Sequence, residues 1–177
     1  AYQSGEPMTL DERLVEAYRL LLADDSLDKS MVALMLNLPS EAYLVGLIDK
    51  ADVQAIHVAR MTAKVELAEQ LQDELWDCYN NNLIDEAYQA NAKQIAARSL
   101  KNIALSYLML LEDEQTLSTC LAQFHGAQNM TDAMAALSVI VNSSLNSEKQ
   151  QLLNDFYRRW QDEALVVNQW LSVQAGC

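Results

Sequence analysis

The chain of 177 residues is long enough for one domain with a sizeable core, because 51% of its residues are hydrophobic. Its formal net charge of −13 argues against nucleic acid or an anionic membrane as a partner, since both are bound through clustered Lys and Arg. Only 4 Gly and 2 Pro are present, a scarcity that disfavours sheets with tight turns and favours amphipathic helices. We therefore expect a single all-helical domain over residues 1–177.

The first helices have recognisable start signals. Thr9 followed by Glu12 resembles a capping box, which predicts a helix that ends near residue 23. Asp28 is the expected N-cap of a short helix that ends near residue 37.

Two further helices follow Pro39. Ser40 is expected to cap a short helix over residues 41–48, and Asp52 to open the longest helix of the chain. Apolar residues recur along that helix at steps of three or four, which predicts one buried stripe: Ile56, Ala59, Ala63, Leu67, Leu71, Leu75 and Cys78. The run Asn80, Asn81, Asn82 is expected to end it.

A long helix is predicted next over residues 86–111. One face of it is expected to be buried and carries Ala96, Leu100, Ile103, Tyr107 and Leu111. Arg98, Lys101 and Asn102 are expected to point elsewhere.

The following helices should pack around an apolar one. A helix over residues 114–124 is expected to end at Gly126 in a left-handed conformation, and Asn129 or Thr131 to cap the next helix. Residues 133–141 are apolar almost all round, so this helix should be central.

Two more helices complete the pattern, which gives about nine in total. Ser147 and Gln150 resemble a capping box for a helix that carries Leu152, Leu153, Phe156 and Trp160. The last helix is predicted over residues 164–173, with Trp170 inside. Short connections favour antiparallel helical hairpins stacked into an irregular superhelix of the HEAT or armadillo kind, and an irregular bundle is the alternative.

Cysteine usage and the apolar runs indicate a reduced, soluble protein. Cys78, Cys120 and Cys177 form no Cys-x-x-Cys spacing, and the longest apolar runs are too short to span a bilayer. We expect a cytoplasmic protein that binds neither membrane nor nucleic acid.

The search for catalytic chemistry is mostly negative. His57 and His125 are the only histidines, and neither belongs to a His-Glu-x-x-His zinc helix. A nucleophile pair of Cys120 and His125 is formally possible, but a small buried thiol and a surface or core-edge histidine are the favoured interpretation. Acidic pairs such as Asp24 with Asp25 are interpreted as solvated helix ends. We expect no catalytic, cofactor-binding or metal-binding residue in this chain.

Two polar features have an ordinary and a functional interpretation. Lys93, Arg98 and Lys101 form a basic face that could meet a carboxylate or an acidic neighbouring domain, although a solvated face paired with nearby acids is favoured. The loop over residues 129–132 could present groups to a ligand or partner, although helix capping is sufficient to explain its Asn, Thr and Asp.

Several segments resemble the aminopeptidase N family of bacterial zinc metallopeptidases, the gluzincins. Residues 124–132 match the Phe-His-x-Ala-x-Asn-Met-Thr-Asp segment of that family, and residues 98–102 are similar to its Arg-x-Leu-Arg-Asn stretch. Residues 160–170 and 36–40 are also similar to family segments, in the same order over residues 14–175.

The resemblance implies that this chain is the first part of the C-terminal helical domain of such an enzyme. The family's Gly-Ala-Met-Glu-Asn and His-Glu-x-x-His motifs have no counterpart here, so no catalytic or zinc-binding residue is carried over. The implied partners are the catalytic domain, the remaining C-terminal helices and the peptide substrates of the parent enzyme, which would hold the zinc. The implied role is a lid over the active-site chamber.

The alternative is a free-standing helical-repeat scaffold that binds other proteins. The two ends resemble the boundaries of a piece cut from a longer protein, whereas natural ends at Ala1 and Cys177 would favour the scaffold. Apolar residues near the C-terminal end, such as Trp170, Leu171 and Val173, would then mediate non-native dimers.

Overall fold

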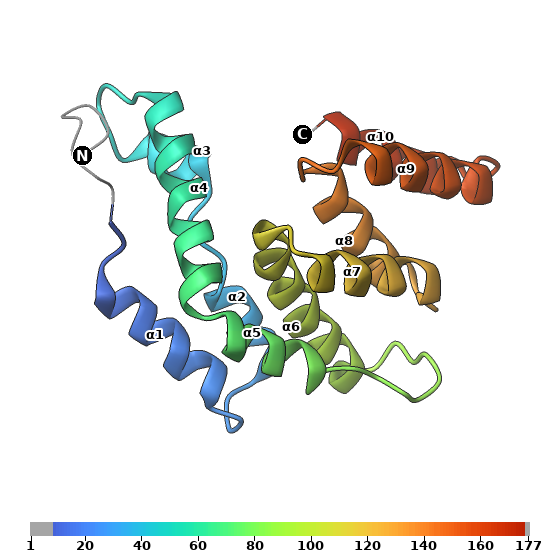
Figure 1. Cartoon of the computed structure of the whole chain (residues 1–177), viewed down its shortest axis with the longest axis horizontal. Coiled ribbons are helices and arrows are strands. Elements are labelled where there is room, and N and C mark those ends of the chain that lie inside the picture. The colour runs from blue at the N-terminus through green and yellow to red at the C-terminus, as the bar shows by residue number, and fades with distance from the viewer. Residues whose placement is uncertain (1–8, 176–177) are drawn as a thin grey trace. The chain divides into compact units, whose positions relative to one another are not determined.

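The chain is built from α-helices. The computed structural model describes residues 9–175, and no β-strand occurs among them. The chain divides into two compact units, Ala1–Leu111 and Glu112–Cys177 (Figure 1). The all-helical prediction is confirmed, with ten α-helices in the described part rather than nine. The expectation of one domain over residues 1–177 stays a prediction.

The first unit contains six α-helices and a short 3₁₀ segment. They are α1 (Glu12–Ala23), α2 (Lys29–Met35), α3 (Glu41–Gly46), α4 (Val53–Gln70), α5 (Gln72–Asn80), α6 (Ala92–Leu108) and η2 (Met109–Leu111). Helix α6 is the centre of this unit, because α2, α4 and α5 all pack against it, while α1 packs on α5 and α3 on α4.

A buried tyrosine connects the end of α6 to the end of α2. The Tyr107 hydroxyl on α6 donates a hydrogen bond of 2.6 Å to the carbonyl of Leu36 at the end of α2. The ring of Tyr18 from α1 meets the Tyr107 ring edge-on, with centroids 6.4 Å apart. Burial raises the pKa of both hydroxyls, so they remain neutral donors.

The predicted long helix after Asp52 is two helices. Asp52 caps α4 as expected, but at Leu71 the backbone leaves the helical range, with φ −120° and ψ 21°. Leu71 is fully buried, and α5 beyond it packs on α1 and α6. The apolar periodicity continues through the break, so the pattern could not reveal it. Most of the predicted stripe is buried, whereas Ala59 is exposed.

Helix α6 begins six residues later than predicted. Asn91 is its N-cap, since its side chain accepts from the Gln94 N–H at 2.8 Å. The Gln94 side chain then accepts from the N–H of Gln89 and donates to the carbonyl of Ala87, at 2.8 and 3.0 Å. These bonds satisfy the backbone of the preceding segment without a helix, which explains why the prediction from residue 86 was wrong.

The second unit contains four helices, α7 (Glu114–Gly126), α8 (Met130–Val141), α9 (Asn146–Trp160) and α10 (Ala164–Ala175). Helix α8 packs on α7, α9 and α10, which confirms that the apolar helix is central. Its Leu137 and Ile140 are fully buried. By contrast, α10 has no fully buried residue, although the Trp170 indole donates to the Leu153 carbonyl at 3.0 Å.

Predicted caps at Asp28, Ser40 and Asn129 are confirmed. The capping box at Thr9 is wrong, because Leu10 donates its N–H to Glu66 on α4 at 2.8 Å and Asp11 caps α1 instead. Residue Ser147 does not cap α9 either. That helix begins at Asn146 without a side-chain cap, and the Ser147 hydroxyl donates to Glu148.

The left-handed residue also lies elsewhere than predicted. Gly126 is the last residue of α7, and Ala127 after it is extended. The left-handed position is Glu112, with φ 49°, directly after η2. Such a backbone costs a non-glycine residue about 1 kcal/mol or more. The Glu112 carboxylate accepts from the Ser144 N–H at 2.7 Å and from the Ser144 hydroxyl, which holds this turn.

We expect Tyr107→Phe to lower the free energy of unfolding by about 1–3 kcal/mol, because it leaves the buried Leu36 carbonyl without its donor. Tyr157→Phe is the matched control, since Tyr157 is 41% exposed. Urea unfolding followed by circular dichroism measures both. Equal losses for the two variants would contradict the assigned role of the Tyr107 hydroxyl.

The cap of α8 gives a second test. Asn129→Ala should lower stability by about 1 kcal/mol, because Asn129 accepts from the Asp132 N–H at 2.9 Å. Thr131→Ala, at the other cap position suggested by the sequence, should change stability by less than about 0.5 kcal/mol, since Thr131 is exposed. Thermal unfolding of the two variants compares them directly, and a larger loss for Thr131→Ala would refute the assignment.

Candidate functional site

Neither histidine lies in a catalytic arrangement. His57 on α4 is exposed, and its Nδ1 lies 2.9 Å from the Glu41 carboxylate of α3. His125 is exposed near the end of α7, where its ring packs edge-on against Phe124. Within residues 9–175, no group of three His, Cys, Asp or Glu side chains could hold a metal ion.

The thiols of the described residues are buried. Cys120 is fully buried and donates to the Ala136 carbonyl at 3.5 Å, and burial raises its pKa to about 12. Cys78 is also buried, with a pKa raised to about 11. A thiol held neutral and away from solvent is a poor nucleophile, so the geometry opposes a pair of Cys120 with the exposed His125. Cys177 lies outside the described residues.

The polar loop between α7 and α8 is a capping structure. Asn129 accepts from the Asp132 N–H and donates to the Asp132 carboxylate at 3.0 Å. The Gln123 side chain donates to the Asp132 carbonyl at 3.1 Å, which joins α7 to the start of α8. The capping interpretation is therefore confirmed for Asn129.

The predicted basic face is not a solvated face. Arg98 is 4% exposed and Lys101 is 6% exposed, so both are buried although they were expected to point elsewhere. The Arg98 guanidinium donates to Gln94 at 3.3 Å and lies over the ring of Tyr88, 5.0 Å from its centre. The segment that precedes α6 folds back over this side chain, an arrangement that helical periodicity does not predict. Lys93 alone is exposed.

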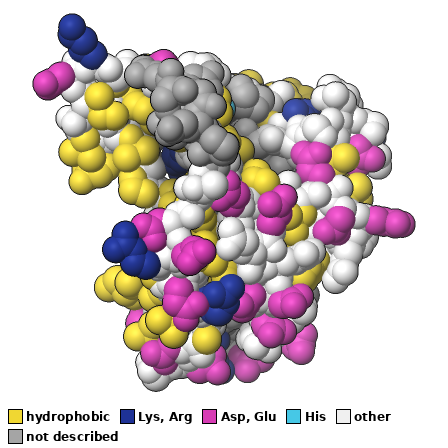
Figure 2. Space-filling view, turned by 60° about the vertical axis from the view of Figure 1, so that its left-hand side comes forward, with side chains coloured by type: hydrophobic (Ala, Val, Ile, Leu, Met, Phe, Trp, Pro, Cys, Tyr) yellow, Lys and Arg dark blue, Asp and Glu magenta, His cyan; other side chains and the backbone are white. Residues whose placement is uncertain are grey.

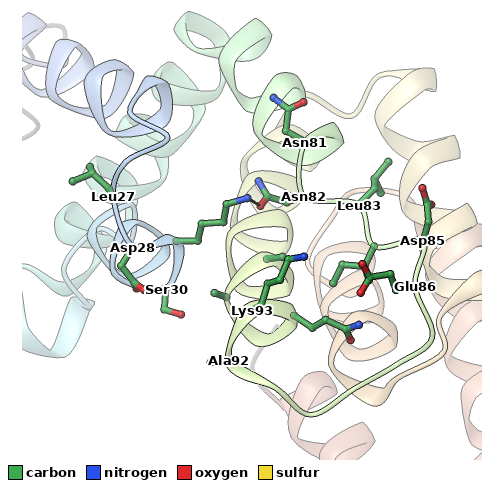
Figure 3. Close-up of a pocket in the computed structure, with 15 residues that line it drawn as sticks. Leu27, Asp28, Ser30, Asn81, Asn82, Leu83, Asp85, Glu86, Ala92 and Lys93 are labelled. Atoms are coloured by element: carbon green, nitrogen blue, oxygen red, sulfur yellow. Dashed lines mark hydrogen bonds between the residues drawn. The ribbon is translucent and has the colours of Figure 1, made fainter.

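A groove of about 640 Å³ lies beside that segment in the first unit (Figure 3). Its walls are the start of α2, the connection between α5 and α6, and the first turns of α6. The apolar part of the lining consists of Leu27, Leu83, Ile84, Ala92, Ala96 and Ala97. A volume of this size is within the usual range of about 300–1,000 Å³ for small-molecule pockets.

One wall of the groove is tied together by a buried amide. Lys29 donates to the Asn82 side-chain oxygen at 2.7 Å, and Asn82 donates to the Cys78 carbonyl at 2.7 Å. Asn82 is only 4% exposed. These two bonds connect the start of α2 with the end of α5. The sequence indicated Asn82 only as a helix terminator.

The charged groups of the groove do not neutralise one another. Lys29 and Lys93 line it together with Asp28, Asp85 and Glu86. Asp28 caps α2 through the Met31 N–H, whereas Asp85 and Glu86 are exposed on the segment at the other side of the groove (Figure 3). Among the salt bridges of the described residues, none joins Lys29 or Lys93 to Asp28, Asp85 or Glu86. No sequence motif indicates this arrangement, because it joins three separate segments.

Other surfaces of the chain are acidic or apolar. Figure 2 shows acidic side chains scattered over the face drawn, with few basic ones between them. Large apolar side chains are exposed on α2 and α10, among them Leu34 at 69% and Leu165 at 80%. No helix formed by the described residues is long and apolar enough to cross a bilayer.

Comparisons with known proteins find that the chain is similar to part of several bacterial aminopeptidases. It is 35% identical to aminopeptidase N of Escherichia coli over 98% of its own length and 31% identical to aminopeptidase N of Haemophilus influenzae over 98%. Against the crystal structure of Legionella pneumophila aminopeptidase A in complex with aspartic acid, the TM-score is 0.82 at 29% identity, covering 98% of this chain and 21% of that chain.

The chain spans only about 20% of the length of the curated relatives that it matches. The matched part is the C-terminal helical region of these relatives, as the sequence resemblance implied. A family model described as a domain of unknown function with ARM repeats matches residues 1–177. The chain therefore belongs to this ARM-repeat family, DUF3458_C.

Proposed function

We propose that this chain is a non-catalytic helical module of a larger bacterial aminopeptidase, an enzyme that removes N-terminal amino acids from peptides. The observation that carries the proposal is the match to aminopeptidase N of Escherichia coli, which covers 98% of this chain but 20% of the relative. The buried thiols, the exposed histidines and the all-helical fold supply no arrangement for peptide hydrolysis in the described residues.

In this proposal, the zinc ion is bound by another part of the parent enzyme. A catalytic zinc needs three protein ligands around an open position, and the described residues provide no such donor set. The metal and the substrate-clamping residues would then lie in the catalytic domain of the parent enzyme. No step of the reaction is assigned to residues of this chain.

The role that we propose for the module is to cover the active-site chamber and limit access to peptides. Exposed apolar side chains support packing against further parts of a longer protein. Leu34 on α2, Leu47 after α3 and Leu165 on α10 are each more than 60% exposed. Contiguous apolar patches are typical of surfaces that another domain covers, and on α2 the exposed Met31, Leu34 and Met35 share one helix face. The catalytic domain and additional helices are the proposed partners.

The proposal predicts a clear division of activity. The purified 177-residue chain should show no hydrolysis of an alanyl chromogenic substrate, whereas the full-length protein should hydrolyse it and lose activity with a zinc chelator. Both should be prepared from a host strain that lacks its own aminopeptidase N. Chelator-sensitive cleavage by the isolated chain would overturn the proposal, and so would a gene without an upstream His-Glu-x-x-His motif.

Thiol reactivity tests the same conclusion independently. At pH 8, a thiol with a pKa of about 11 is ionised in only about one molecule in a thousand, so Cys78 and Cys120 should react slowly with a chromogenic disulfide. We expect the Cys177→Ser variant to release colour only after denaturation in urea. A rapid reaction of one equivalent in the folded Cys177→Ser variant would show that a buried thiol is accessible and activated.

A further inference from the structure

One arginine of the first unit carries a buried charge that no neighbouring carboxylate neutralises. Arg98 on α6 is 4% exposed, and none of the salt bridges formed by the described residues includes it. By contrast, Arg13, Arg19 and Arg158 each pair with a carboxylate although their side chains are 40% exposed or more. Withdrawing a cation from water is costly unless an anion lies against it, so the need for an anion is greatest at Arg98.

The Arg98 guanidinium uses one of its three nitrogens. Its Nη1 donates to the Gln94 side-chain oxygen at 3.3 Å, and no described residue accepts from Nε or Nη2. Every fully buried side-chain nitrogen and oxygen of the described residues has a hydrogen-bond partner. The two unbonded nitrogens are therefore not fully buried, and the small exposed part of Arg98 includes them.

These two nitrogens form the edge that binds carboxylates. The N–H bonds of Nε and Nη2 run parallel along one side of the guanidinium plane, at the spacing of two carboxylate oxygens. Arg13 shows this edge occupied, because its Nε and Nη2 donate to the two Asp11 carboxylate oxygens at 3.0 and 2.6 Å. On Arg98 the same edge has no acceptor among the described residues.

The groups around the guanidinium hold it in place without adding a negative charge. The ring of Tyr88 lies against it, with its centre 5.0 Å from the guanidinium carbon. Gln94 is 3% exposed and fixes the segment of Tyr88, because it donates to the Ala87 carbonyl and accepts from the Gln89 N–H. A cation positioned in this way needs little rearrangement to bind an anion.

We propose that the unoccupied edge of Arg98 binds a carboxylate, whose two oxygens would accept from Nε and Nη2. The acidic residues on the segment of Tyr88, Asp85 and Glu86, are exposed and form no salt bridge with Arg98. Because Arg98 has so little exposed surface, the fitting group is a compact one. The proposal does not depend on the proposed function, since it rests on residues of the first unit.

The probe is sodium acetate, titrated into the 177-residue chain with ¹⁵N-labelled arginine and followed through the Nε–H signals by NMR. Sodium chloride at the same ionic strength is the reference. The Arg98 signal should shift and saturate, with half-saturation at about 10 mM acetate, because an acceptor then occupies Nε. The Arg98→Lys variant, which keeps the charge but lacks the edge, identifies the signal by its loss. Through-bond correlation to the backbone identifies it independently of that variant.

Arg159 is the matched control in the same sample. It also lies against an aromatic ring, 5.3 Å from the centre of Trp160, and forms no salt bridge among the described residues, but it is exposed. Acetate should bind Arg98 about tenfold more tightly than Arg159, because water competes less at a buried edge. The Arg13 signal should not shift, since Asp11 occupies its edge.

A carboxylate can come from a small molecule in solution or from an acidic side chain elsewhere in a longer protein. The same titration on the full-length protein distinguishes these sources. An Arg98 signal that responds to acetate assigns a free carboxylate, whereas a signal already at the bound position and insensitive to acetate assigns a side chain. Either result supports the proposal.

Three outcomes would overturn the proposal. They are an Arg98 signal in the 177-residue chain that does not move up to about 100 mM acetate, equal shifts with acetate and chloride, and equal affinity at Arg98 and Arg159. A full-length protein whose Arg98 signal stays at the unbound position and ignores acetate would also overturn it. Peptidase activity does not enter the test, so its failure leaves the proposed enzyme function untouched.

Discussion

The architecture of the first unit depends on burying one face of a single helix against three others. Helix α6 is contacted by α2, α4 and α5, and its Ala104, Leu105 and Leu108 have no exposed surface. A polar side chain can point into the core from such a helix only where it finds a hydrogen-bond partner. Tyr107 meets this condition through the Leu36 carbonyl, and in doing so it fixes the end of α2 against α6. The groove is one result, because α2 and α6 form two of its walls.

Local chemistry made much of the fold predictable. Side chains such as Asp28, Ser40, Asp52 and Asn129 cap helices because their oxygens accept from backbone N–H groups two or three residues on, a relation visible in the sequence. Two predictions failed because another side chain satisfies the backbone next to the helix start. Glu66 accepts from Leu10 before α1, and Gln94 satisfies the backbone before α6. Neither partner can be identified from periodicity.

The candidate site was less predictable than the fold for the same reason. Lys29, Asn82 and Lys93 belong to different segments and carry no shared motif, so only the packing of α2, α5 and α6 brings them together. The prediction of a solvated basic face failed for a different reason. Arg98 lies on the same helix as Lys93, but its side chain is buried and the ring of Tyr88 lies against its guanidinium. Charge alone therefore does not indicate which side of a helix meets water.

The Gln94 side chain has a further consequence for how this surface can change. A side-chain amide offers the same donor and acceptor as a peptide group, and Gln94 uses both on backbone atoms of the neighbouring segment. The identities of the side chains in that segment play no part in these two bonds. Substitutions at Leu83, Asp85 or Glu86 can thus accumulate while the path of the backbone is kept. A region built in this manner is free to acquire a new ligand preference through a few point mutations, with the scaffold inherited intact.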